Sequence, residues 1–245
     1  GFWCLPVWVA RRLGKTVWRD RLVRLCYKGI LPILGVHLKT TGRLDEGRPL
    51  LVVSNHLSYL DVCILGSQAP VRFTPKSEIA SWPLIGGICR LCGDVFVDRR
   101  PDKVRESGDA LRAALARGEA VSLFPEATTG NGRHLLPFKS GFFSLAEEPV
   151  GERELLVQPA AIAYTRIRRL PVDSTQWPLL AWYGDMPLVP HLWELLKLGS
   201  VSAELVFLPA TTLSEHGDRK HLAAHCRHAI AAALASVREA AVGRK

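Results

Sequence analysis

Short apolar segments with strong β propensity alternate along this chain with segments of helical spacing. The strand candidates are Val36–Thr41, Leu50–Ser54, Val71–Pro75, Val95–Asp98, Ala120–Phe124, Val157–Ala163 and Ala203–Leu208. The helix candidates are Tyr59–Leu65, Pro83–Leu91, Lys103–Ala116, Gly141–Glu147 and Arg219–Arg238. This alternation favours an α/β fold, in which a central, mostly mixed β-sheet is covered by helices. The stretch from Thr165 to Pro190 interrupts the pattern and is interpreted as an irregular insertion.

The composition is that of a globular protein. Of the 245 residues, 48% are hydrophobic and 22% are charged, which argues against disorder and against a coiled coil. The length suits one sizeable domain with a small attachment. We therefore expect an N-terminal segment, residues 1–35, and a main domain, residues 36–245.

The net charge of +9 favours anionic partners such as phosphate groups, acidic carrier proteins, membranes or nucleic acid. No nucleic-acid-binding motif is present, so we do not expect nucleic acid as a partner. The six cysteines are sparse for this length and do not indicate a disulfide scaffold.

The N-terminal segment has the pattern of a basic amphipathic helix. The apolar positions at helical spacing are Val9, Leu13, Val17, Leu22 and Cys26, and the cations between them are Arg11, Arg12, Lys15, Arg19 and Lys28. Such a helix suits either the interface of an anionic membrane or packing on its own domain. Trp3, Trp8 and Trp18 favour the membrane. No apolar run reaches the ~18 residues of a spanning helix, so we expect a peripheral or monotopic protein.

The stretch VVSNHLSYLD leaves an apolar strand and places His56 five residues before Asp61. Both would lie near the carboxyl end of that strand, where open α/β sheets expose their sites. A carboxylate that accepts a hydrogen bond from one ring nitrogen orients a histidine, so the other nitrogen can take a proton from a hydroxyl. Two other interpretations stay open at this point, a pair of metal ligands and a polar loop that caps a helix.

Two later segments repeat this design, in which an apolar strand runs into polar residues. Gly93–Arg100 reads GDVFVDRR, and the guanidinium groups of Arg99 and Arg100 suit a phosphate. Phe124–Gly132 reads FPEATTGNG and combines Glu126 with two glycines, which permit close approach of the backbone to a ligand. Each segment alone also suits a solvated strand end or a plain turn.

Taken together, N-H-x-x-x-x-D, V-F-V-D-R, F-P-E-x-T and Q-P-A resemble the four-block pattern of the glycerolipid acyltransferases, that is, the 1-acylglycerol-3-phosphate or lysophospholipid acyltransferase family. The similarity runs from about Gly42 to Tyr164. It implies the fold of that family and an O-acyltransferase of membrane lipid biosynthesis. The acyl donor would be acyl-CoA or acyl-carrier protein, and the acceptor would be the free hydroxyl of a lysolipid of the 1-acyl-sn-glycerol-3-phosphate type.

The resemblance also implies roles for single residues. His56 corresponds to the general base and Asp61 to its orienting acid, and the acceptor attacks the thioester directly, without an acyl-enzyme. Arg99 corresponds to the arginine that binds the acceptor phosphate, with Lys76 as a helper. The predicted substrate-binding residues are Asn55, Lys76, Arg99, Glu126, Thr128 and Gly130. No cofactor is implied, and we expect the protein on the cytoplasmic face of the inner or plasma membrane.

One block departs from the commonest pattern of the family. That pattern reads F-P-E-G-T-R, whereas this chain has Ala127 and Thr129 where glycine and arginine would stand. The loss of one guanidinium puts a phosphate-bearing acceptor such as lysophosphatidic acid in question. The variant, together with Leu136–Lys139 and Ala181–Met186, resembles the branch that includes lyso-ornithine lipid acyltransferases.

Two further patterns have the spacing of metal sites. Cys89-x-x-Cys92 lacks a second ligand pair, and we interpret both thiols as core residues. His221, His225 and His228 fit one face of a helix, which we interpret as a solvated face. We therefore expect no metal. A non-catalytic lipid-binding module and a metal-dependent hydrolase that uses His56 and Asp61 as ligands stay as alternative functions.

Overall fold

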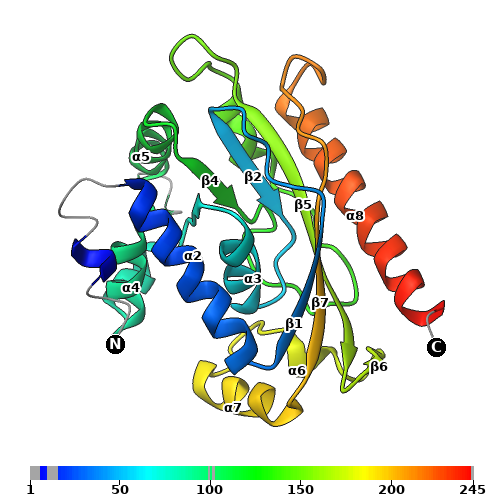
Figure 1. Ribbon diagram of the computed structural model, residues 1–245. Coiled ribbons are helices and arrows are strands. Elements are labelled where there is room, and N and C mark those ends of the chain that lie inside the picture. Colours follow the sequence, from blue (N-terminus) through cyan, green and yellow to red (C-terminus); the bar gives the residue numbers. More distant parts are fainter. Residues whose placement is uncertain (1–5, 10–15, 99, 101–102, 244–245) are drawn as a thin grey trace.

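The computed structural model describes residues 6–9, 16–98, 100 and 103–243 (Figure 1). Its centre is a seven-stranded sheet in the order β1-β7-β5-β2-β4-β3, with β6 paired to β5. The strands are β1 (Val36–Thr41), β2 (Leu50–Ser54), β3 (Val71–Arg72), β4 (Ala120–Leu123), β5 (Leu156–Ile167), β6 (Leu170–Pro171) and β7 (Val201–Phe207). β2 runs parallel to β4 and β5, and β7 runs antiparallel to β5. The predicted mixed sheet is confirmed.

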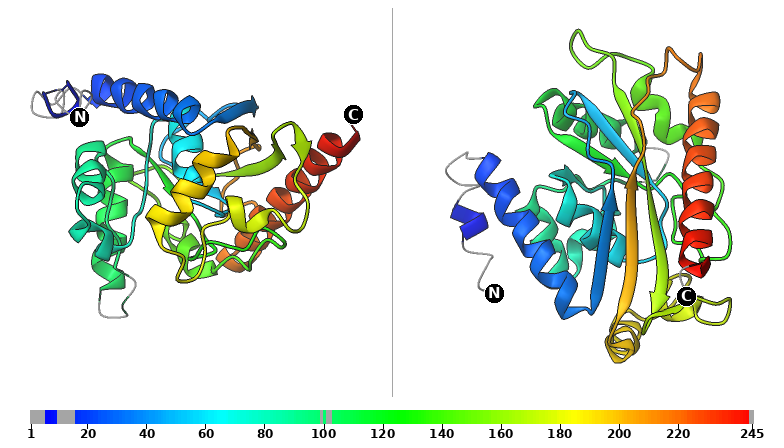
Figure 2. Two further views of the ribbon diagram at one scale, coloured as in Figure 1. Left: turned by 90° about the horizontal axis from the view of Figure 1, so that it is seen from below. Right: turned by 45° about the vertical axis from the view of Figure 1, so that its right-hand side comes forward.

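Helices cover both faces of the sheet (Figure 2). One face packs against α2 (Thr16–Ile33), α3 (Leu60–Gln68), α6 (Trp177–Leu180) and α7 (Leu188–Leu198). The other face packs against α5 (Val104–Ala116), the 3₁₀ helix η2 (Ser140–Ala146) and α8 (Arg219–Gly243). The 3₁₀ helix η1 (Ser77–Ser81) and α4 (Ile85–Cys92) follow β3. Since β2 is buried on both faces, its run of apolar residues without alternation is explained.

The predicted strand Val95–Asp98 does not form as a strand. Val95 and Val97 donate hydrogen bonds to the carbonyls of Phe73 and Pro75, each at 2.9 Å, but only an isolated bridge between Lys76 and Val97 results. Pro75 has no N–H with which to return a bond to Val95. The ladder is therefore incomplete.

The first helix of the sheet-covering layer, α2, is part of the core. Val23 and Leu31 of α2 are buried, and the Tyr27 ring lies directly on α3. A Cβ added to Gly66 of α3 would stand 2.5 Å from that ring, so a glycine is needed there. Residues 16–35 thus share one hydrophobic core with the predicted main domain.

A buried group of charges fixes α2 to the sheet. Arg72 of β3 is 2% exposed and donates to Asp20 of α2 at 2.6 Å, and its Nε lies 3.3 Å from Glu119. Arg19 donates to Glu119 at 2.9 Å and is also buried. Arg19 therefore faces the protein and not solvent, because these carboxylates lie on that side. The apolar side chains of Val17 and Trp18 are left 62% and 57% exposed.

No helix among the described ranges is at once long enough and apolar enough to cross a lipid bilayer.

We predict that Asp20→Ala lowers the free energy of unfolding by about 3 kcal/mol, because it leaves the buried Arg72 guanidinium with one carboxylate fewer. Urea denaturation measures the change. Asp109→Ala, which removes an exposed carboxylate of α5, is the control and should change stability by less than about 0.5 kcal/mol. Equal effects of the two substitutions would show that the charges around Arg72 do not hold α2.

Candidate active site

The candidate site is the loop that joins β2 to α3. β2 is completely buried and ends at Ser54, and α3 begins at Leu60 with Asp61 in its first turn. His56 and Asp61 therefore lie at the carboxyl end of a parallel strand, as the sequence predicts.

Asp61 is fully buried and organises this loop. Its Oδ2 atom accepts hydrogen bonds from the backbone N–H groups of Leu57 (2.6 Å) and Ser58 (2.8 Å) and lies 2.9 Å from Nδ1 of His56. Its Oδ1 atom accepts from the Tyr164 hydroxyl at 2.6 Å. An ionised carboxylate only accepts, so Nδ1 of His56 carries the proton and Nε2 is the basic nitrogen.

The His56 ring is held between this carboxylate and an aromatic stack. It lies parallel to the Phe124 ring, with centroids 3.9 Å apart and planes at 12°. Phe124 in turn stacks on Phe73, at 6.4 Å and 10°. The His56 side chain is still 19% exposed, so it is fixed in orientation and open to a ligand.

Glu126 holds the main chain of the same histidine. Its Oε1 atom accepts from the His56 N–H at 2.6 Å, and its Oε2 atom accepts from the Leu136 N–H at 2.9 Å. Burial raises the pKa of Glu126 to about 6, although these two donors and the nearby His56 favour the charged form. Each oxygen accepts one backbone N–H group, so Glu126 positions His56, and its contact with an acceptor stays a prediction.

The backbone around Glu126 closes over the histidine. The Gly130 N–H donates to the His56 carbonyl at 2.9 Å, which uses the backbone group predicted to bind the acceptor. Ala127 has φ +63°, in the left-handed region that favours glycine. Glycine is the residue that the commonest family pattern has at this position. Thr128 is exposed at the surface of this loop and stays a candidate for substrate contact.

The side-chain amide of Asn55 connects the end of β2 to β5. Its Nδ2 atom donates to the Ile162 carbonyl at 3.0 Å, and its Oδ1 atom accepts from the Ile162 N–H at 2.9 Å. The amide is buried and ties the end of β2 to β5, so its placement does not support the predicted contact with substrate.

The two predicted phosphate-binding cations are placed differently. Lys76 is exposed at the start of η1, three residues beyond Phe73 of the aromatic stack, and its substrate contact stays a prediction. Arg99 lies outside the described residues. Its neighbour Arg100 forms an exposed ion pair with Asp98, at 2.6 Å.

The sequence pattern of the acyltransferase family matches residues 35–163, which contain every residue of the site described above except Tyr164. The chain belongs to the acyltransferase family. It is therefore an enzyme of acyl transfer.

Two kinds of curated relative match this acyltransferase over most of its length. A lyso-ornithine lipid O-acyltransferase from Brucella abortus is 36% identical over 91% of this chain and 85% of the relative. A 1-acyl-sn-glycerol-3-phosphate acyltransferase from Neisseria gonorrhoeae is 32% identical over the same shares of the two chains.

Among solved structures, the 1-acyl-sn-glycerophosphate (LPA) acyltransferase PlsC from Thermotoga maritima has a similar fold. The TM-score is 0.66, at 16% sequence identity, over 93% of this chain and 83% of that one. The predicted fold of the family is thus confirmed for this acyltransferase.

Among the described residues, the other nucleophiles and metal ligands do not assemble a second site. Burial raises the pKa of the Cys63, Cys89, Cys92 and Cys226 thiols to about 12, so none of these is a ready thiolate. In the part of the chain that the structure describes, no three His, Cys, Asp or Glu side chains gather as a metal site requires. The candidate His221 pairs with Asp218 instead, at 2.9 Å.

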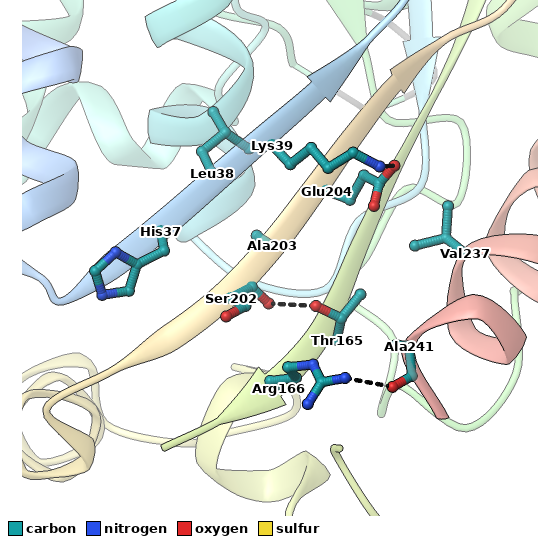
Figure 3. Close-up of a pocket in the computed structure, with 10 residues that line it drawn as sticks. All are labelled: His37, Leu38, Lys39, Thr165, Arg166, Ser202, Ala203, Glu204, Val237 and Ala241. Carbon is teal, nitrogen blue, oxygen red and sulfur yellow. Dashed lines mark hydrogen bonds and ion pairs between the residues drawn. The ribbon is translucent and has the colours of Figure 1, made fainter. Parts of the chain in front are cut away.

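A groove of about 300 Å³ lies where α8 covers the sheet, between β1, β7, β5 and the end of α8 (Figure 3). Its charged groups are paired within the protein. Lys39 donates to Glu204 at 2.6 Å, and Arg166 donates to the carbonyls of Ala241 and Arg169, both at 2.7 Å. The groove contains none of the predicted site residues. The Arg166 guanidinium therefore caps the last turn of α8.

Several contacts of the site were not predicted from the sequence. Tyr164 completes the hydrogen bonds of Asp61, and a tyrosine in the apolar run of β5 is a signal for such a partner, because a buried hydroxyl needs one. The segment that follows β5 also contacts the loop of His56. The backbone N–H of Trp182 donates to the Leu57 carbonyl at 3.0 Å, and the Tyr59 hydroxyl lies 3.1 Å from Nδ1 of His191. No local pattern places these residues beside His56.

We predict that the buried Glu126 makes stability depend on pH. Its folded pKa of about 6 exceeds the ordinary value of 4.5, so the folded state holds the proton more tightly between these values. As pH rises through this window, the stability advantage of wild type over Glu126→Gln should shrink by about 2 kcal/mol. Urea denaturation of both proteins across the window measures it. A constant difference between the two would contradict the raised pKa.

We also predict that Ala127→Gly raises the free energy of unfolding by up to about 1 kcal/mol, because it removes the cost of a Cβ in the left-handed region. Ala113→Gly, at an exposed helical position of α5, is the matched control and should lower stability by about 0.5–1 kcal/mol. The same denaturation experiment measures both. A loss at Ala127 equal to that at Ala113 would show that the loop is not strained.

Proposed function

We propose that this acyltransferase moves an acyl chain from acyl-CoA or acyl-carrier protein to the free hydroxyl of a lyso-ornithine lipid, with His56 as general base. The observation that carries the mechanism is the 2.9 Å contact between Nδ1 of His56 and the fully buried Asp61. It assigns the proton to Nδ1 and leaves Nε2 basic.

The reaction requires His56 to hold the proton of the acceptor hydroxyl until the thiolate leaves. As the acceptor hydroxyl oxygen bonds to the thioester carbonyl carbon, Nε2 of His56 takes the hydroxyl proton. The tetrahedral intermediate then loses the sulfur, and the leaving thiolate receives that proton. The products are the ester and a free thiol, and His56 is again neutral.

Asp61 supports both steps. A buried carboxylate at hydrogen-bond distance stabilises the imidazolium while Nε2 carries the extra proton. Asp61 accepts from Leu57, Ser58 and Tyr164 at the same time, and these donors hold the carboxylate in place. The arrangement needs no acyl-enzyme, which agrees with the raised pKa of the buried Cys63 thiol nearby.

Three observations favour the lyso-ornithine acceptor. The Brucella abortus relative with 36% identity carries that name. Thr129 stands where the commonest pattern has arginine, and an ornithine head group, with a carboxylate and an amine, does not require that phosphate contact. The segment Ala181–Met186, which resembles the same branch, lies against the catalytic loop through Trp182 and Leu57.

A 1-acyl-sn-glycerol-3-phosphate acceptor is the second candidate. It is favoured by the 32% identity to the Neisseria gonorrhoeae relative of that name. Lys76 and Arg99 would then bind the phosphate, as the family resemblance implies, and Thr128 would lie beside it.

We further propose that the protein acts at an anionic membrane surface, on its cytoplasmic face, where both donor thioesters occur. The outward face of α2 supports this proposal. It exposes Trp18 and Leu25 beside Arg21 and Lys28, which combines apolar side chains with cations.

The decisive experiment follows thiol release and lipid product with each donor and with both lysolipids in detergent micelles. We predict that His56→Ala lowers kcat by about 10²–10⁴-fold, because the base is lost, with little change in KM. His228→Ala, the same change at an exposed position of α8, is the control and should leave kcat unchanged.

Each alternative has a distinct result in this assay. Unchanged turnover in His56→Ala would refute the general base. Product from 1-acyl-sn-glycerol-3-phosphate alone would replace the acceptor by the second candidate. Loss of activity with a chelator would favour a metal-dependent hydrolase, and absence of transfer with every pair would favour a lipid-binding module.

A further inference from the structure

We propose that the outer face of α7 is a second membrane-docking surface, which rests on the surface of an anionic bilayer beside the active site. This inference rests on the proposed lysolipid acceptor, which is drawn from a membrane. We define the surface as Val189, Trp193 and Leu196, bordered by the cations Arg168, Arg169 and Lys197.

α7 has two faces of different character. Val189, Trp193 and Leu196 are spaced by four and three residues, so they lie along one side of the helix. They are 74%, 62% and 38% exposed. The opposite side carries His191 and Leu195, which are 5% and 1% exposed. The fold therefore uses one face of α7 and leaves an apolar stripe unburied.

The border of this stripe is basic. Lys197 lies 6.0 Å from the centroid of the Trp193 ring and also pairs with Glu194. Arg168 donates to the carbonyls of Leu198 (3.0 Å) and Lys197 (2.9 Å), so the turn that follows β5 lies at the end of α7. Arg169 and the 67% exposed Leu170 continue this turn. Tryptophan with flanking cations suits the head-group region of an anionic membrane.

The end of α7 lies next to the end of α2. Gly35 follows α2 and Gly199 follows α7, and a Cβ added to Gly35 would stand 2.5 Å from the Gly199 carbonyl oxygen. The two helices therefore end side by side, and α7 lies at the lower end of the molecule in Figure 1. Ile33, at the end of α2, is 75% exposed. One membrane plane can meet both helix ends.

The buried face of α7 reaches the catalytic loop. Nδ1 of His191 lies at hydrogen-bond distance, 3.1 Å, from the hydroxyl of Tyr59, and Tyr59 stands two residues before Asp61. Burial lowers the pKa of His191. A bilayer on the outer face of α7 would thus lie one helix away from the loop that carries His56.

The size of the stripe argues against a second copy of the chain as its partner. Three such side chains offer on the order of 300 Å². A stable dimer buries about 800 Å² per partner. A bilayer needs no such minimum, because each apolar side chain that enters it contributes separately.

The experiment compares full-length proteins on vesicles of phosphatidylcholine and phosphatidylglycerol by co-sedimentation. The test variant is Val189→Glu/Trp193→Glu. The matched control is Ala232→Glu/Ser236→Glu, which places the same charges at the same spacing on exposed positions of α8. We expect the α7 variant to lower the partition coefficient about tenfold or more, and the control to change it much less. Trp193→Ala, which adds no charge, should also lower it.

A second arm separates this inference from the proposed function. The α7 variant should keep wild-type activity with lysolipid in detergent micelles and lose it with lysolipid in vesicles. A wild type without transfer in micelles would refute the proposed function, whereas the vesicle partition would still test α7.

Two results would overturn the inference. One is equal vesicle partition of the α7 variant and the α8 control. The other is a wild-type dimer, found by light scattering, that the α7 variant converts to a monomer while its vesicle binding is unchanged.

Discussion

A buried carboxylate at the start of α3 constrains the rest of this enzyme. Asp61 has no exposed surface, and a charge in that position is tolerated only when hydrogen bonds replace the lost water. Its donors come from the loop before it and from β5, at Tyr164. Satisfying Asp61 therefore fixes the path of the loop, the start of α3 and the position of β5 beside β2. The orientation of the His56 ring follows from the same set of bonds.

Three other residues that the sequence suggested for substrate binding support the backbone around His56. Glu126 and Gly130 hold the backbone of His56, and Asn55 ties the strand before it to β5. These side chains have the types that a substrate site would use, yet they are satisfied by main-chain groups. A buried donor or acceptor without a partner costs more free energy than a made hydrogen bond contributes. Glu126 and Asn55 supply partners for backbone groups of the loop and of β5.

Elements outside the matched region depend on this loop and on the sheet behind it. α2 is fixed by Asp20 on the buried Arg72 and by packing on α3, so it is a structural part of the enzyme as well as a candidate for membrane contact. α7 is fixed through His191 on Tyr59. Both helices turn an apolar face outward, and both have the opposite face committed to the core. In each helix, the packed side thus serves the core and the exposed apolar side is the one proposed for membrane contact.

The sequence by itself determined the α/β class, the position of β1 and β2, and the pair His56 and Asp61. These depend on local periodicity and on residues that neighbour each other along the chain, so a pattern reveals them. Only the tertiary structure decided that Arg19 is buried, that Glu126 and Asn55 bind backbone, and that Trp182 and His191 lie at the loop between β2 and α3. Each of those outcomes depends on a partner distant in sequence, such as Glu119, Ile162 or Tyr59. A residue type states which bonds a side chain can make, and the packing of remote segments decides which partner it meets.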